Sequence, residues 1–150
     1  MKHAAARFAT CLALLPAGLA VVSSAAHAES YVVVHPANPL KALTQKEAVD
    51  LFMGKTRHFP NGDFALAFDL PRDSPARAAF YQALTGQGVA QVNSYWARLM
   101  FTGQTLPPQP VPDEAAMAEL VRRNPSAIGY LSREPGDRGL RIVLVLKDGH

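Results

Sequence analysis

The chain has 150 residues, of which 15 are basic, 12 are acidic and one is a cysteine. This length allows one small domain with its own core. The nearly balanced charge gives little support to a nucleic-acid-binding protein, and a single cysteine excludes an intrachain disulfide and a multi-cysteine metal site.

The N-terminal part of the sequence has the pattern of a secretory signal peptide. Lys2 and Arg7 form a short basic region, and the apolar run Phe8–Val22 follows it. The segment Ala26–Ala28 has the small residues of a cleavage site. Because the apolar run is short for a membrane span, we expect residues 1–28 to be cleaved and the protein to be exported to the periplasm, not embedded in the membrane.

The expected mature chain, residues 29–150, is long enough for a single domain. Removing the leader takes away Lys2, Arg7 and Cys11, so that 13 basic residues remain against 12 acidic ones, a net charge of +1, with no cysteine. The mature protein is therefore expected to have no disulfide and no thiol chemistry, even in an oxidising compartment.

The first elements of this domain are a strand and a helix. The β-branched run Tyr31–Val34 predicts a central strand. Thr44 and Glu47 have the spacing of a capping box, which starts a helix that Gly54 ends.

A second strand and helix follow. The apolar run Phe64–Phe68 predicts a strand that is buried on both faces. Ser74 and Pro75 then form a helix-start signal, with the serine as N-cap and the proline in the first helical position. The predicted buried face of this helix consists of Ala76, Ala79, Phe80, Ala83 and Leu84.

The remaining chain contains two helices and two strands. The apolar stripe of the first helix begins at Val89 and includes Trp96, and Asp113 caps the second. Between them, Thr105–Pro112 contains four prolines and is expected to be a stiff loop without regular structure. The runs Ala127–Leu131 and Leu140–Leu146 predict two further strands.

This order of elements predicts an α/β fold. Strands and helices alternate at first, and two helices then precede the last strands. We expect helices to flank a mixed, mostly parallel sheet with an antiparallel strand near its end.

No catalytic or metal-binding motif is found. The sequence has no nucleophile elbow, no P-loop, no zinc-protease motif and no dinucleotide fingerprint. His35 and His58 have no partner at ligand spacing, and Ser74 has no base near it in the sequence. We therefore expect a protein that is not an enzyme and has no cofactor and no metal; a hydrolase using Ser74 would need a base brought from far along the chain.

The start of the helix at Ser74 is the candidate binding site. A buried strand that leads into a helix N-terminus directs free N–H groups at the crevice beyond the strand, where anions bind in α/β folds. Arg72 and Arg77 flank this point and favour an anion. The simpler alternative is that Ser74 only caps the helix and both arginines are solvated, and Pro75 removes one donor.

Four segments together resemble the periplasmic phosphate-binding proteins of ABC transporters. Residues 32–55 resemble a segment in which an Asn-Pro loop precedes a helix ending in Phe-x-Gly-Lys. Residues 74–80 are similar to the Ser-Gly-Thr-Arg-x-x-Phe phosphate loop, and residues 126–131 match an Ala-Ile-Gly-Tyr strand. Residues 95–109 resemble short, single-lobe exported relatives that are labelled as phosphate substrate-binding proteins.

This resemblance implies one lobe of a type II periplasmic binding protein with a weak site for phosphate or a similar oxyanion. It implies that the Ser74 hydroxyl, the Ala76 N–H and Arg77 contact the anion, and that Arg72 and Asp73 correspond to an arginine and an aspartate of the family. Pro75 stands where the family has a glycine, and Ala76 where it has a threonine.

Two functions remain open at this stage. The first is a phosphate-binding-like module, linked to phosphate ABC transport through a permease or another envelope protein. Because a lone lobe leaves its site open to water, we expect it to bind phosphate with a dissociation constant on the order of millimolar or weaker. The second is a ligand-free protein-interaction module of the cell envelope that keeps the fold, which the residues at positions 75 and 76 favour.

Overall fold

A computed structural model describes residues 28–148 of the chain. The predicted signal peptide lies outside these residues except for Ala28, and the final His150 also lies outside them. No helix among residues 28–148 is both long and apolar enough to cross a membrane.

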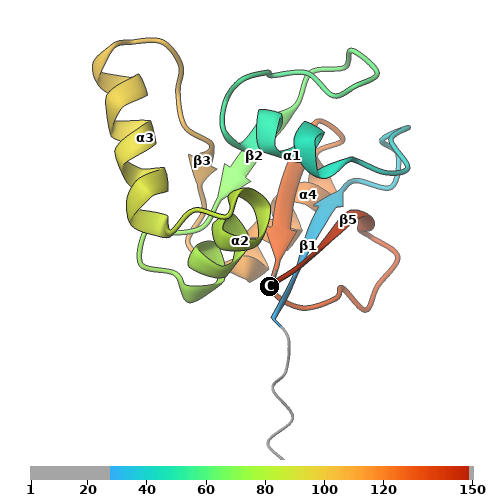
Figure 1. Ribbon diagram of the computed structural model, residues 1–150. Coiled ribbons are helices and arrows are strands. Elements are labelled where there is room, and N and C mark those ends of the chain that lie inside the picture. Colours follow the sequence, from blue (N-terminus) through green and yellow to red (C-terminus); the bar gives the residue numbers. More distant parts are fainter. Residues whose placement is uncertain (1–27, 149–150) are drawn as a thin grey trace, which may run out of the picture.

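The described residues form a five-stranded mixed sheet in the order β3-β2-β4-β1-β5 (Figure 1). The strands are β1 (Glu29–Val34), β2 (Leu66–Asp69), β3 (Gln109–Pro110), β4 (Ala127–Leu131) and β5 (Arg141–Lys147). β2 is parallel to β3 and β4, whereas β1 lies between β4 and β5 and is antiparallel to both. The mixed sheet is confirmed, but the antiparallel strand is the first one of the chain and not one near its end.

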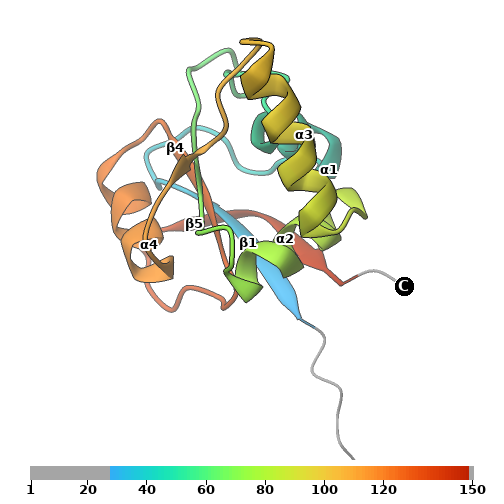
Figure 2. The ribbon, with the colours of Figure 1, turned by 90° about the vertical axis from the view of Figure 1, so that its left-hand side faces the viewer.

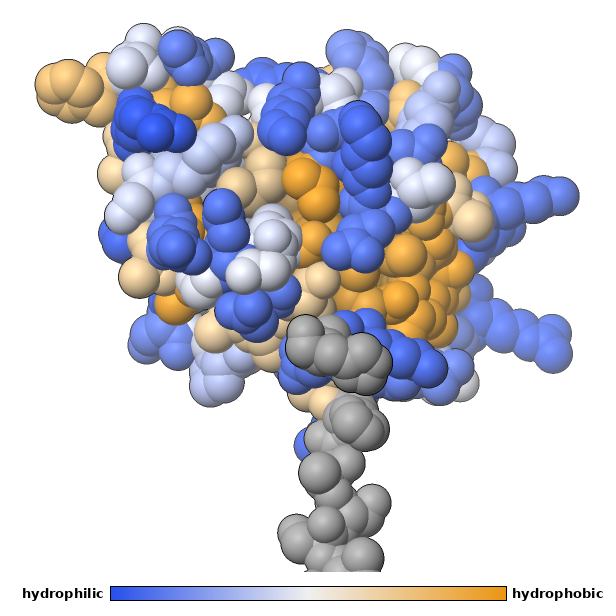
Figure 3. Space-filling view, in the orientation of Figure 1, coloured by the Kyte–Doolittle hydropathy of each residue, from blue (hydrophilic) through white to orange (hydrophobic). Residues whose placement is uncertain are grey.

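Four helices flank this sheet: α1 (Gln45–Phe52), α2 (Pro75–Thr85), α3 (Val89–Phe101) and α4 (Glu114–Arg123). α4 covers one face, against β4 and β1, and α1 and α2 cover the opposite face (Figure 2). α3 packs against α2 and stands beside β3 at the left of Figure 1. The hydrophobic surface in Figure 3 is largest toward the lower right, the side on which β5 lies.

Two predictions about the sheet edge are wrong. β2 begins at Leu66, and Phe64 is exposed, because residues 57–65 form a turn that a bridge between His58 and Phe64 closes. The proline segment contains a short edge strand, β3, because Val111 donates a backbone hydrogen bond of 2.9 Å to the Asp69 carbonyl. An edge position accommodates Pro110, which has no N–H to donate.

The predicted helix starts are confirmed. Thr44 and Glu47 form a complete capping box on α1, and the Ser74 hydroxyl accepts a hydrogen bond of 3.3 Å from the Arg77 backbone N–H at the start of α2. Gly54 follows the last residues of α1 with a φ of +73°, as a residue that ends a helix often does.

The core contains an aromatic cluster between α1, α2 and β4. The Phe80 ring stacks on Tyr130 with centroids 3.7 Å apart, and Phe52 meets Phe80 edge to face at 4.8 Å. The face that α2 buries differs from the predicted one: it consists of Arg77, Phe80, Tyr81 and Leu84. The spacing of these residues is that of one helical face, as in the prediction, but the first residue of the observed face is the charged Arg77.

The close approach of Gly54 to Trp96 yields a stability prediction. A Cβ atom at Gly54 would lie 2.6 Å from Trp96 Cη2, whereas a Cβ at Gly86 would meet nothing within 4 Å. Both glycines have nearly the same positive φ, +73° and +72°. Gly86→Ala should therefore lower the free energy of unfolding by about 1–2 kcal/mol, the cost of a positive φ at an alanine. Gly54→Ala should lower it by about 1–3 kcal/mol more, because the buried Trp96 indole must move.

Urea unfolding of both variants measures this difference. Equal losses of unfolding free energy would contradict the packing of Trp96 over the end of α1.

Candidate functional site

The last residue of β2, Asp69, is buried and accepts four hydrogen bonds. Its Oδ1 atom accepts from the Tyr130 hydroxyl at 2.5 Å and from the Leu70 backbone N–H at 2.9 Å. Its Oδ2 atom accepts from Arg77 Nε at 2.9 Å and from the Tyr81 hydroxyl at 3.1 Å. A carboxylate has about four acceptor positions, so Asp69 has none left for a ligand.

The Arg77 guanidinium is held from three sides. Its Nε atom donates to Asp69, its Nη1 atom donates to the Asn93 Oδ1 atom at 2.9 Å, and its Cζ atom lies 5.0 Å from the centre of the Tyr81 ring. Only 4% of the residue is exposed. These contacts leave the Nη2 side of the guanidinium without a hydrogen-bond partner among residues 28–148.

The two tyrosines act as permanent donors to Asp69. Burial and the neighbouring Asp69 carboxylate raise the pKa of Tyr81 and of Tyr130. Both hydroxyls therefore stay protonated at physiological pH. The network keeps one geometry because every member has a partner.

Arg77 and Arg72 face the same hollow of about 620 Å³, which also borders Asp69, Asn93 and Trp96. We call it the arginine hollow. Arg72 is exposed, and its guanidinium makes no ion pair within residues 28–148. The hollow lies beyond the carboxyl end of β2, where ligands bind in open α/β sheets. Its rim is apolar and includes Met100, Phe101 and three prolines of the loop before α4.

The start of α2 borders a different hollow, of about 340 Å³, which we call the acidic hollow. Ser74 and Asp73 line it together with Asp113 and Glu114 from the start of α4. Three acidic residues therefore line the hollow that Ser74 borders, although the Glu114 carboxylate accepts hydrogen bonds from Ser132 and the Asp113 carboxylate caps α4. This environment repels an anion, although the helix dipole attracts one.

The structure thus divides the five residues of the predicted oxyanion site. Arg72 and Arg77 line the arginine hollow, Asp73 and Ser74 line the acidic hollow, and Ala76 lines neither. The roles of these residues in binding stay predictions.

Sequence reasoning missed Asp69, Asn93 and Tyr130, which fix the position of Arg77. Asp69 could have been noticed, because a carboxylate directly follows the apolar run Phe64–Phe68. Asn93 and Tyr130 lie 16 and 53 residues from Arg77 along the chain, and nothing local points to them. Residues 28–148 contain no cluster of three or more His, Cys, Asp or Glu side chains that could hold a metal.

Comparison with known proteins gives a result for the fold only. No family model matches the sequence, and no curated protein matches it. Solved structures do match. One is assigned as a phosphate ABC transporter substrate-binding protein with bound phosphate, from Clostridium perfringens, with a TM-score of 0.62 and 21% identity over 78% of this chain. Another is an ABC-type phosphate transport receptor from Vibrio cholerae, with a TM-score of 0.61 and 17% identity over 78% of this chain.

The chain shares the fold of these phosphate substrate-binding proteins. PstS from Borrelia burgdorferi is a more distant match, with a TM-score of 0.51 and 9% identity. The match covers 44% of the Clostridium protein and 46% of the Vibrio protein. This chain therefore corresponds to somewhat less than half of each of these two substrate-binding proteins.

The buried ion pair yields a prediction for a double-mutant cycle. Asp69→Asn leaves the Arg77 charge buried without its counter-ion, and Arg77→Gln leaves the carboxylate in the same state. Each single substitution should cost about 3–5 kcal/mol of unfolding free energy. The double variant should lose clearly less than the sum, since neither charge is then stranded.

Urea unfolding of the four proteins at neutral pH measures the coupling. Strictly additive losses would show that Asp69 and Arg77 stabilise the fold independently, contrary to the geometry.

Proposed function

We propose that the protein is a phosphate-binding-protein-like module that binds phosphate or a similar oxyanion weakly in the arginine hollow. The observation that carries the proposal is the orientation of Arg77. Its Nε and Nη1 atoms donate to Asp69 and Asn93, its Nη2 side has no such partner among residues 28–148, and the residue lines a hollow that Arg72 also borders. Two guanidiniums next to one space suit an oxyanion: Arg72 can donate two parallel hydrogen bonds, and Arg77 can add a bond from Nη2.

The same contacts argue that binding is weak. Asp69 neutralises the charge of Arg77, so Arg72 supplies the net positive charge of the hollow. The hollow is open to water and salt, which screen the attraction. We therefore expect affinity on the order of millimolar or weaker for inorganic phosphate.

In this proposal Ser74 acts mainly as the cap of α2. Its hydroxyl accepts from the Arg77 backbone N–H, and acidic residues line the hollow that it borders. Asp73 and the Ala76 N–H belong to this helix start. Pro75 has no N–H, which further weakens this point as an anion site.

The location and partners follow from the same hypothesis. We propose that the protein is exported to the periplasm and works with an ABC permease or another envelope protein, without catalytic activity. The signal-peptide pattern of residues 1–28 supports export. The neighbours in fold are described as substrate-binding and transport-receptor proteins, which supports a binding role over an enzymatic one.

Calorimetric titration of the purified protein with phosphate at low salt, with sulfate for comparison, tests the proposal. We expect phosphate to bind with a dissociation constant on the order of millimolar. Arg72→Gln should weaken binding severalfold by removing the net charge. Ser74→Ala should leave binding unchanged and cost about 1 kcal/mol of unfolding free energy.

Arg138→Gln is the matched control, because Arg138 is exposed and does not border the arginine hollow. Absence of binding at tens of millimolar phosphate, well above the expected constant, would contradict the function. Loss of binding in Ser74→Ala together with normal binding in Arg72→Gln would indicate that the anion binds at the start of α2 and not in the arginine hollow.

A further inference from the structure

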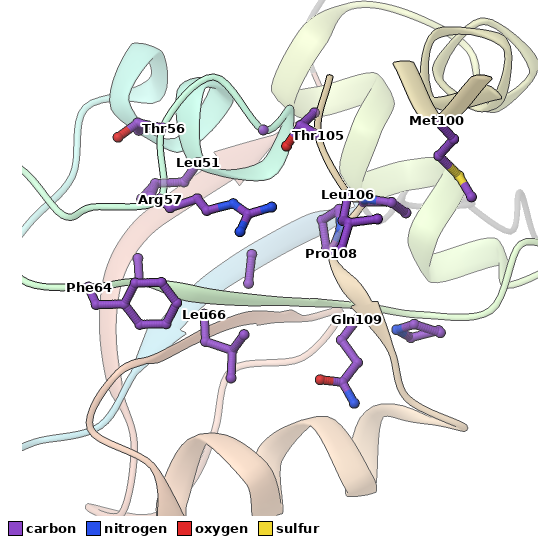
Figure 4. A pocket seen from close by; sticks show the side chains of 15 residues that line it. Leu51, Thr56, Arg57, Phe64, Leu66, Met100, Thr105, Leu106, Pro108 and Gln109 are labelled. Atoms are coloured by element: carbon purple, nitrogen blue, oxygen red, sulfur yellow. The ribbon is translucent and has the colours of Figure 1, made fainter. Parts of the chain in front are cut away.

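A third hollow, of about 480 Å³, lies across the proline segment from the arginine hollow. Residues 54–57 after α1, residues 64–67 at the start of β2 and the loop 105–110 form its walls (Figure 4). Met100, Pro107, Pro108 and Pro110 line both this hollow and the arginine hollow. We call it the apolar hollow, because hydrophobic side chains form most of its walls.

Exposed hydrophobic side chains concentrate at this hollow. Six large hydrophobic residues are exposed among residues 28–148, and three of them, Phe64, Met100 and Leu106, line the apolar hollow. Their exposed fractions are 51%, 54% and 69%. Single exposed hydrophobic residues are ordinary, but a group of them around one concavity indicates a binding surface.

Of the residues that the structure describes, Arg57 is the only charged one that lines the apolar hollow. Figure 4 shows its side chain reaching into the middle of the space, with Phe64 and Leu66 on one side and Leu106 and Pro108 on the other. Its guanidinium has neither an ion pair nor a hydrogen bond with any residue between 28 and 148. The hollow therefore presents one exposed cation, without an ion pair among residues 28–148, beside mostly hydrophobic walls.

The hollow is held in shape by its backbone. The Ala65 N–H donates to the Arg57 carbonyl at 2.8 Å, and the Phe59 N–H donates to the Asp63 carbonyl at 2.8 Å, which fixes the turn that carries Arg57 and Phe64. The Phe64 ring packs edge to face on His58 with centroids 6.3 Å apart. The opposite wall is stiffened by Pro107, Pro108 and Pro110, whose backbone torsions are restricted.

We propose that the apolar hollow binds a small organic anion that has one carboxylate and a hydrophobic body. The carboxylate pairs with the Arg57 guanidinium, and the body lies against Phe64, Leu66 and Leu106. Arg72 and Arg77 do not line this hollow, so the site is separate from the proposed phosphate site and does not depend on it.

Size and chemistry favour this class of ligand. The volume lies in the range of pockets for small organic molecules, about 300–1,000 Å³. Inorganic phosphate would leave the hydrophobic walls in contact with water and gain nothing from them. A neutral hydrophobic molecule would contact the same walls but would gain nothing from the exposed Arg57 charge.

Titration with 4-phenylbutyrate, followed by amide chemical shifts in NMR spectra of the protein, tests the proposal. Acetate supplies the charge alone, and 4-phenylbutanol supplies the hydrophobic body alone. We expect 4-phenylbutyrate to bind with a dissociation constant below about 1 mM and to shift the amide signals of residues 54–57 and 64–67 and of Thr105, Leu106 and Gln109. Acetate and the alcohol should each bind about tenfold more weakly, a difference that one charge-assisted contact or one hydrophobic group can supply.

Variants separate the two contributions. Arg57→Gln should weaken 4-phenylbutyrate binding about tenfold and leave the alcohol unaffected. Leu106→Gln should weaken both ligands. Arg138→Gln changes the net charge by the same amount away from the hollow and should leave both affinities unchanged, and Arg72→Gln should do the same.

Any of four results would overturn the proposal. The first is that 4-phenylbutyrate causes no shifts even at about 10 mM, ten times the expected constant. The second is that the alcohol binds as well as the acid, and the third is that Arg57→Gln behaves as Arg138→Gln does. The fourth is that the shifts lie around Arg72 and Arg77 instead. Each can occur whether or not inorganic phosphate binds, so failure here is distinguishable from failure of the proposed phosphate site.

Discussion

The buried ion pair between Asp69 and Arg77 is the interaction on which the rest of the site depends. It joins the end of β2 to the first turn of α2, and Tyr81 and Tyr130 add donors from α2 and β4. A pair with 6% and 4% exposure loses nearly all of its hydration, which the additional hydrogen bonds must replace. These hydrogen bonds replace the lost hydration of Asp69, since all of its acceptor positions are filled. The result is an arginine with one fixed orientation rather than a flexible surface charge.

That constraint also limits what the protein can do with Arg77. Two of its five N–H donors and its net charge serve the fold, so an anion in the arginine hollow would depend on Arg72 for net attraction. The two hollows on either side of the proline segment therefore differ in character. The arginine hollow has the paired Arg77 and the exposed Arg72 on its walls. The apolar hollow has hydrophobic walls and Arg57, which has no ion pair among residues 28–148. The shared wall from Met100 to Pro110 means that a ligand in either hollow contacts the same loop.

Local signals in the sequence predict the helix starts and most strands well, because caps and short apolar runs act over a few residues. Thr44, Glu47 and Ser74 cap as predicted, and β4 has the predicted limits. The buried face of α2 could not be chosen in this way. Arg77, Phe80, Tyr81 and Leu84 and the alanine-based alternative have the same spacing, and only Asp69, eight residues earlier on another element, makes burial of Arg77 favourable. The position of β1 between β4 and β5 depends on pairing with strands far along the chain, so the local sequence does not predict it either.

The most direct test of this account is the ¹⁵N–¹H spectrum of the arginine side chains. We predict that the Arg77 Nε–H signal exchanges slowly with water and keeps its position when phosphate is added, because its bond to Asp69 persists. The Arg77 Nη and Arg72 signals should shift in the same titration. An Arg77 Nε–H signal that exchanges as fast as those of exposed arginines would contradict the buried pair, and with it the proposed basis of the site.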